Sequence, residues 1–345
     1  MKIPTNLRWK PTGKTIGQGG QGHVVEVTDP ALSSQVFALK ALAKNASQKA
    51  YERFAREMSA LKNLSHPYII KVVDYSQPAA DFQFYVMEFC SEAESLKKKM
   101  DEGRNHASGD ALKALSLFEK IVTALAVCEQ QAPKIVHRDL SPANVLVLPD
   151  ETIRLIDFGL CQIENETAIT LTDEGVGTPN YMAPECESGS EGRIATPSDL
   201  YSAGKILWSA ITNQRAFSRE TPAFTTKSMQ QMFPANPETW HLQHLFEYTI
   251  RHDPAKRWQD TTDALFWTKQ VRNLILGRYP PVETIGKICV VCGVGELSDF
   301  QGSHMVFGNP NPSGIYSRKC DYCGHCFAID FAGLHARAEE RKKFN

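Results

Sequence analysis

The sequence predicts an α+β protein with two lobes, a small β-rich lobe and a larger helical lobe, followed by a short metal-binding module. Three observations support this prediction. Short apolar runs separated by turns dominate residues 1–89, and helical apolar spacing dominates from residue 110 onward. Five of the nine cysteines lie within residues 288–345. A sheet-rich segment followed by a helix-rich segment is typical of α+β architecture.

The bulk composition suits a globular chain of this size. The 345 residues are 42% apolar and 22% charged, which is enough apolar material for a substantial core. The formal net charge of −1 provides no global basic field for nucleic acid or anionic membranes. No apolar run reaches the ~18 residues of a transmembrane helix, and the N-terminus has no signal-peptide pattern. We therefore expect a cytoplasmic protein that does not bind membranes.

In the first lobe, strand-like runs surround one helix. A helix is predicted over Ser47–Leu64, where Phe54, Met58 and Leu61 recur at helical spacing. Strands are predicted at His23–Val27, Val36–Ala41, Ile69–Asp74 and Phe82–Phe89.

The second lobe begins with a long amphipathic helix, predicted over Ala111–Glu129. Two short strands follow, at Val145–Leu148 and Thr152–Ile156, and the remainder to about Leu276 is mainly helix and loop.

A glycine-rich loop lies near the N-terminus. Gly17, Gly19 and Gly22 form a G-x-G-x-x-G-x-V pattern that ends at Val24. Glycines allow backbone amides to approach phosphate oxygens closely. Alone, the pattern also fits an ordinary glycine-rich hairpin or a dinucleotide site, but a dinucleotide site needs a helix directly afterwards. The β-branched residues that follow favour a strand instead.

Lys40 and Glu57 form a candidate pair. Lys40 closes the apolar strand after the glycine loop, and Glu57 lies on the predicted helix. Either residue alone reads as an exposed charge at a strand end or on a helix face. Together, a lysine that reaches phosphates and a carboxylate that holds it in place point to nucleotide binding.

The strongest signal is a run of polar residues around the two strands of the second lobe. Asp139 and Asn144 belong to His-Arg-Asp-Leu-Ser-Pro-Ala-Asn, and Asp157 begins Asp-Phe-Gly thirteen residues after Asn144. One hairpin would present all three at a single site. Phosphoryl transfer needs a base that aligns the attacking hydroxyl, which suits Asp139, and oxygen ligands for Mg²⁺, which suit Asn144 and Asp157.

In this order the motifs resemble the eukaryotic-type (Hanks-like) protein kinase superfamily, from about Thr12 to Leu276. The resemblance implies the bilobal protein-kinase fold, ATP with Mg²⁺ or Mn²⁺ as cofactors, and a protein substrate. Further matching residues are Ala183-Pro184-Glu185, Asp199, which would brace the catalytic loop, and Arg257, which would pair with Glu185. The compact catalytic domain and short tail resemble bacterial members.

The resemblance also implies roles for individual residues. Lys40 would contact the α- and β-phosphates and Glu57 would orient it. Met87 would stand at the back of the adenine pocket. The side chains of Val24, Ala38 and Leu146 would sandwich the adenine ring. The backbone of Glu88 and Cys90 would form hydrogen bonds with it.

The loop after Asp157 resembles that of serine/threonine kinases. Thr178 would contact Asp139 and discriminate against tyrosine. Arg138 before the catalytic aspartate implies control by phosphorylation of this loop, and the available hydroxyls are Thr167, Thr170 and Thr172. We favour autophosphorylation at Thr170 or Thr172, with a plain polar loop as the alternative.

Two departures from the family pattern bear on activity. Ser141 stands where serine/threonine kinases usually have lysine, and Gln21 stands where the loop tip is usually aromatic. Neither removes the base or a Mg²⁺ ligand, so we expect an enzyme. The alternative is a nucleotide-binding pseudokinase that acts as a scaffold.

The tail carries two C-x-x-C-G knuckles, which resemble a zinc ribbon. Their cysteines, Cys289, Cys292, Cys320 and Cys323, suit a closed structural Cys₄ zinc site. His325 and Cys326 would be spare, unless one of them replaces a ligand. A disulfide or redox pair is the alternative.

The predicted domains are a kinase domain at 1–276, with lobes at about 1–89 and 90–276, a linker at 277–287 and the zinc module at 288–345. The module would dock a partner or substrate. A second alternative is a kinase gated by nucleic acid bound to the ribbon, which salt-dependent binding would reveal.

Overall fold

The computed structural model describes residues 3–19, 22–32, 35–77, 80–163, 180–187, 194–217 and 228–276, and the strands at 315–319 and 326–330. The chain separates into two compact units, Met1–Phe266 and Trp267–Asn345. The boundary between these units lies inside the last long helix, ten residues before the linker predicted at 277–287. The domain limits expected from the sequence stay a prediction.

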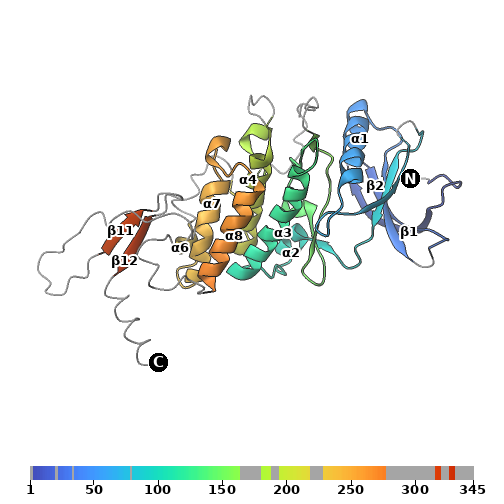
Figure 1. The fold of residues 1–345 in the computed structure, drawn as a ribbon. Helices are drawn as coiled ribbons and strands as arrows, with labels where there is room; N and C mark the ends of the chain where they lie inside the picture. Colours follow the sequence, from blue (N-terminus) through green and yellow to red (C-terminus); the bar gives the residue numbers. More distant parts are fainter. Residues whose placement is uncertain are drawn as a thin grey trace, which may run out of the picture. The chain divides into compact units, whose positions relative to one another are not determined.

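A five-stranded antiparallel sheet in the order β1-β2-β3-β5-β4 forms the first part of the larger unit (Figure 1). One face of the sheet packs into a core around Trp9, where Val27, Leu39 and Val86 have no exposed surface. The alternating residues point to the opposite face. The strands are β1 (Lys10–Gly19), β2 (Gly22–Thr28), β3 (Val36–Leu42), β4 (Val72–Tyr75) and β5 (Phe84–Glu88).

The predicted strands in this sheet are confirmed to within two residues for β2, β3 and β5. The strand predicted from Ile69 begins only at Val72, because Ile69 forms an isolated parallel bridge with Leu155 of the second lobe. Strand β1 was not predicted. Its residues are mostly polar and exposed, since it is an edge strand, so the sequence shows no apolar alternation there.

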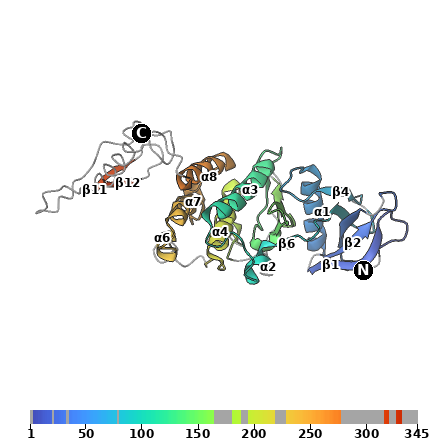
Figure 2. The same cartoon turned by 90° about the horizontal axis from the view of Figure 1, so that it is seen from below.

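Helix α1 (Gln48–Asn63) confirms the predicted helix. Ser47 caps its N-terminus by accepting a hydrogen bond from the Ala50 amide at 3.2 Å. Phe54 and Leu61 are buried on the inner face of the helix. In both views α1 lies between the sheet and the helical part of the unit (Figure 1, Figure 2), so a side chain on this helix can reach both.

The helical lobe is built around α3 (Ala111–Glu129), whose ends are those predicted, and α4 (Thr196–Thr212), which packs against α3 and α7. Gly204 of α4 permits the approach of α7, because a Cβ there would lie 2.2 Å from Thr249 Oγ1. The described residues also include the helices α2 (Leu96–Asp101), α6 (Met229–Met232), α7 (Gln243–Thr249) and α8 (Thr261–Ile275). They include the 3₁₀ turns η1 (Pro142–Asn144), η2 (Pro184–Cys186), η3 (Pro237–Leu242) and η4 (Pro254–Lys256).

Short strands connect the two lobes. Strands β8 (Val145–Val147) and β9 (Ile153–Leu155) form the predicted hairpin, each slightly shorter than expected. Because η1 precedes β8 and Asp157 follows β9 closely, this hairpin brings the two polar motifs of the second lobe together. Further short strands of this lobe are β6 (Glu94–Ser95), which pairs with β8, and β7 (Ile135–Val136), which pairs with β10 (Gln162–Ile163).

In the second unit, β11 (Ile315–Lys319) and β12 (Cys326–Asp330) form an antiparallel hairpin in which Lys319 lies opposite Cys326. The four predicted zinc ligands and His325 lie outside the described residues. None of the helices in the described part of the chain has the length and apolarity needed to cross a bilayer.

Candidate active site

Lys40 and Glu57 form the buried ion pair that the sequence predicts. The Lys40 Nζ donates to both carboxylate oxygens of Glu57 at 2.7 Å, and Glu57 has no exposed surface. Burial opposes the charge on the lysine, but the Glu57 carboxylate raises the pKa of Lys40 well above its usual value. Lys40 therefore carries a fixed positive charge, 3.5 Å from Asp157 Oδ1.

Asp139 and Asn144 lie side by side at η1. The Asn144 side-chain amide donates to the Asp139 backbone carbonyl at 2.7 Å and to Asp139 Oδ2 at 3.3 Å. The Asn144 carbonyl accepts from the Ile156 amide at 3.1 Å, next to Asp157 in the chain. The pairing of β8 with β9 thus joins the two motifs, as expected from the sequence.

Asp157 is held as a charged group. Burial alone would raise the pKa of its carboxyl, but Lys40 and then His137 lower it below the ordinary value. Its backbone adopts a left-handed conformation with φ of 63°, which is uncommon for a residue other than glycine. Such strained conformations cluster at functional sites.

Asp199 of α4 braces the loop that precedes Asp139. Its two carboxylate oxygens accept hydrogen bonds from the His137 amide at 2.7 Å and the Arg138 amide at 2.9 Å. Arg138 also has a positive φ, of 67°. Because Asp199 is buried and satisfies both amides, it fixes the loop conformation immediately before Asp139.

A cavity of about 700 Å³ lies beside the Lys40–Glu57 pair. A volume of this size suits a nucleotide. The expected nucleotide residues on its wall are Gly17, Gly22, Val24, Ala38, Lys40, Met87, Glu88, Cys90, Leu146 and Asp157. The wall also includes residues that the sequence interpretation did not name: Lys14, Thr15, Ile16, Ile70, Tyr85, Phe89, Glu92, Ala93 and Ile156.

The glycine loop has a second constraint besides phosphate access. Gly19, the last residue of β1, pairs with Gly22, the first residue of β2. A Cβ on Gly22 would lie 2.3 Å from the carbonyl oxygen of Ala41 in β3, so no other residue fits there without displacing the strand. Gln21 at the loop tip lies outside the described residues.

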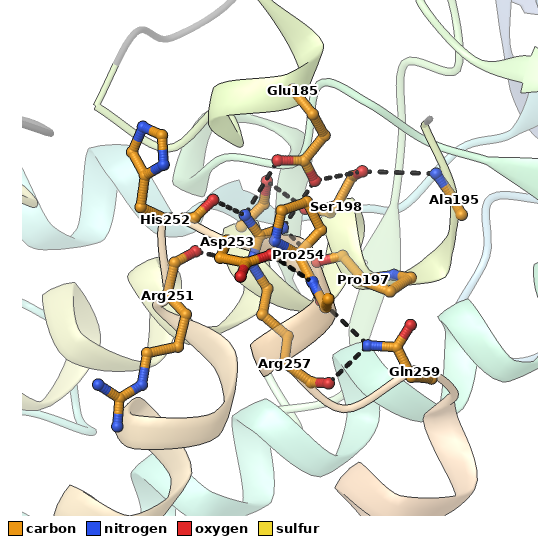
Figure 3. A network of polar contacts seen from close by, with 12 residues as sticks. Glu185, Ala195, Pro197, Ser198, Arg251, His252, Asp253, Pro254, Arg257 and Gln259 are labelled. Carbon is orange, nitrogen blue, oxygen red and sulfur yellow. Dashed lines mark hydrogen bonds and ion pairs between the residues drawn. The ribbon is translucent and has the colours of Figure 1, made fainter. Parts of the chain in front are cut away.

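A buried network around Arg257 joins distant parts of the helical lobe (Figure 3). The Arg257 guanidinium binds the Glu185 carboxylate in a two-pronged fashion, at 2.6 and 2.9 Å, and Ser198 of α4 donates to the same carboxylate at 2.7 Å. Burial acts to raise the pKa of Glu185, but the hydrogen bonds from Arg257 and Ser198 bring this pKa below its ordinary value. The Ala183-Pro184-Glu185 segment is thus fixed to α4 and to the segment before α8.

Two buried arginines have guanidinium nitrogens with no hydrogen-bond partner among the described residues. Arg53 of α1 has free Nε and Nη2 atoms, and Arg138 has a free Nε. Ser141 is also buried, and its hydroxyl has no partner within the described ranges. Arg53 was not named from the sequence, because an arginine on a helix reads as a solvent-exposed charge. The loop threonines Thr167, Thr170, Thr172 and Thr178 lie outside the described residues.

The side-chain oxygen atoms at this site are suitable ligands for magnesium. Asp157 offers a charged carboxylate on the cavity wall, and the side-chain oxygen of Asn144 has no hydrogen-bond partner among the described residues. Oxygen ligands of this kind are those that Mg²⁺ prefers. In the described part of the chain, no group of three or more histidine, cysteine, aspartate or glutamate residues forms a metal site.

Comparison with known proteins agrees with this geometry. Residues 11–268 match the model of the protein kinase domain. The chain is 32% identical over 260 residues to a probable serine/threonine-protein kinase PknB of Lactococcus lactis, covering 73% of this chain and 40% of that protein.

Two further bacterial relatives are similar. The chain is 29% identical to the serine/threonine-protein kinase PknA of Corynebacterium glutamicum, over 77% of this chain and 56% of the relative. It is 29% identical to the serine/threonine-protein kinase PrkC of Bacillus subtilis, over 72% of this chain and 38% of the relative. The chain thus spans roughly two fifths to just over half of the length of these relatives.

Proposed function

Because this chain belongs to the protein kinase family, we propose that it is a serine/threonine protein kinase that uses ATP with Mg²⁺ or Mn²⁺. One observation carries the proposal: Lys40, paired with Glu57, shares the wall of a nucleotide-sized cavity with Asp157, and Asn144 joins Asp139 to the hairpin that precedes Asp157. The names of the relatives support serine or threonine as the target.

Each residue has a role in the proposed reaction. Lys40, oriented by Glu57, binds phosphate oxygens. Asp139 aligns the substrate hydroxyl and accepts its proton as the oxygen attacks the γ-phosphorus and the bond to the ADP oxygen breaks. Asn144 and Asp157 would hold Mg²⁺, which neutralises phosphate charge when bound.

Phosphorylation of the loop that follows Asp157 is part of the proposal. Arg138 precedes the catalytic Asp139, and its buried Nε has no partner in the described part of the chain. A buried unpaired guanidinium nitrogen is costly, and a phosphate on Thr170 or Thr172 is an anion that could pair with it. Thr178 would contact Asp139 and favour serine or threonine.

The zinc module is proposed to dock a partner or substrate. Strands β11 and β12 pair directly on either side of residues 320–325, the segment that carries Cys320 and Cys323. Two cysteines spaced C-x₂-C in the connection between paired strands suit one half of a Cys₄ zinc site. Cys326 is the first residue of β12, which supports its expected position outside the Cys₄ set. Location in the cytoplasm remains a prediction.

Transfer of the γ-phosphate from ATP·Mg²⁺ to the chain itself and to a generic basic protein tests the function. We expect wild-type transfer, and a loss of roughly 10²–10⁴-fold in Asp139→Ala, since the base is removed. Asp150→Ala, which changes an exposed aspartate in the β8–β9 loop, is the matched control and should transfer normally. Mapping the phosphosites tests Thr170 and Thr172.

Two outcomes would redirect the interpretation. Nucleotide binding without transfer, in the presence of either metal, would favour a pseudokinase scaffold, for which the buried Ser141 in place of a lysine is the supporting feature. Salt-dependent binding of DNA or RNA that changes the transfer rate would favour a nucleic-acid-gated kinase.

A further inference from the structure

Tyr85 lies directly opposite Lys40 across the β3–β5 pair. Residues that face each other on adjacent strands project their side chains to the same side of the sheet. On that side the Tyr85 ring is 2% exposed and packs against Phe54 of α1, with ring centroids 5.5 Å apart. The Lys40 Nζ lies 5.8 Å from the centroid of the Tyr85 ring. Tyr85 therefore contacts both β3 and α1.

The Tyr85 hydroxyl completes the environment of Glu57. It donates to Glu57 Oε1 at 2.9 Å, so among the described residues this oxygen has two donors, Tyr85 and Lys40, while Oε2 accepts from Lys40 alone. A carboxylate with no exposed surface stays charged only where donors replace the lost water. Tyr85 is the donor that would remain if Lys40 turned toward another anion.

We propose that Tyr85 is a positioning residue for phosphoryl transfer, whose hydroxyl holds the Glu57 carboxylate, and through it α1, in the orientation that pairs with Lys40. This inference rests on the proposed function. The Lys40 ammonium has three N–H groups and already lies within 3.5 Å of Asp157. When it contacts phosphate oxygens it must divide these donors between Glu57 and the nucleotide, whereas the Tyr85 hydroxyl stays with Glu57.

The charged groups around Glu57 give the inference a pH signature. Burial raises the pKa of Glu57. The Lys40 ammonium of β3 lowers this pKa, the Asp157 carboxylate after β9 raises it, and the hydrogen bond from Tyr85 of β5 lowers it. Removing the hydroxyl raises the pKa of Glu57 further. Glu57 must be ionised to orient Lys40. A variant without the Tyr85 hydroxyl should therefore lose activity first at the acid end of the pH profile.

Tyr85→Phe is the test, because it removes the hydroxyl and keeps the ring against Phe54. We expect kcat/KM for ATP to fall about tenfold, the size of effect that follows the loss of a hydrogen bond to a buried charge. The acid limb of the pH profile should move to higher pH, and nucleotide affinity should weaken. Tyr75→Phe is the matched control: Tyr75 lies opposite Tyr85 on β4, and its kinetics and pH profile should match the wild type.

The outcomes separate this inference from the proposed function. An acid limb at the wild-type position in Tyr85→Phe overturns the positioning role, even if kcat/KM falls through lost stability. If the wild type does not transfer phosphate, the pH dependence of ATP·Mg²⁺ affinity replaces the kinetic profile. Equal affinities of the wild type and Tyr85→Phe across the acid range would then refute the role of Tyr85 independently of catalysis.

Discussion

Lys205 in the middle of α4 is a lysine with no exposed surface. Its Nζ donates to the Phe217 carbonyl at 3.0 Å and lies 3.6 Å from the centroid of the Phe217 ring. Within the described ranges no carboxylate forms an ion pair with it. Burial lowers the pKa of Lys205 to about 7, since an ammonium group without an anion loses more solvation than its contacts return.

Lys205→Met should therefore stabilise the kinase domain. The folded-state pKa lies below the unfolded value, so the unfolded chain binds the proton more tightly between about pH 7 and 10, and wild-type stability rises with pH across this window. Methionine has a similar volume and no charge. We expect the free energy of unfolding in urea to increase by ~1–3 kcal/mol at pH 7, with a smaller gain at pH 9.5.

An exposed lysine provides the control for this measurement. Lys97 pairs with Asp101 on the surface of α2, and Lys97→Met should change the free energy of unfolding by less than ~0.5 kcal/mol at either pH. A Lys205→Met variant that is no more stable than the wild type at pH 7 would mean that the ammonium is compensated in the folded state.

At the scale of the element, α1 connects stability to the active site. It carries Glu57, which holds Lys40, and Phe54, which packs on the sheet. Both ends of the helix are defined by single residues: Ser47 caps the first turn, and the chain becomes extended at Leu64. Since short helices depend on caps and packing, loosening the first turn should affect the position of Glu57.

Ser47→Ala should reduce stability and nucleotide affinity together. The loss of an N-cap costs about 1 kcal/mol, measured as the free energy of unfolding in urea. Asp110→Ala removes the corresponding cap of α3, which accepts from the Lys113 amide at 2.9 Å, and should cost a similar amount without weakening ATP·Mg²⁺ binding. Equal affinities for Ser47→Ala and the wild type would show that α1 holds Glu57 without its first turn.

At the scale of the whole molecule, the chain combines a protein kinase domain held by its own core with a second unit whose proposed zinc site would stabilise it. In the first, buried contacts such as Glu185–Arg257 join segments far apart in sequence. In the second, the described structure is the end of α8 and, beyond it, one hairpin. A module this short has little core, so a bound metal would contribute much of its folding free energy.

Metal removal should therefore affect only the second unit. We expect about one zinc ion per chain by elemental analysis, lost in a Cys289→Ser, Cys320→Ser double variant. The tail of this variant should become sensitive to protease while the unfolding transition of the kinase domain is unchanged. Cys326→Ser is the control and should retain the metal. Purified wild-type chain without zinc would refute the module as proposed.

The sequence alone predicted the elements whose residues carry a local signal. The apolar spacing of α1 and α3, the β-branched run of β2, the apolar run of β3, and the glycine, lysine and aspartate motifs each lie within short windows of the chain. A glycine loop or an Asp-Phe-Gly motif restricts backbone and chemistry locally, so these features can be read residue by residue.

Tertiary structure decided what depends on neighbours far away in the chain. Tyr85 reads as an ordinary strand residue until the β3–β5 register places it opposite Lys40 and within reach of Glu57. The charge state of Lys205 and the need for glycine at position 22 likewise follow from packing. Burial and hydrogen bonding are properties of the assembled core, and for this reason local patterns indicated the motifs of the candidate site but not the contacts of Tyr85 and Lys205.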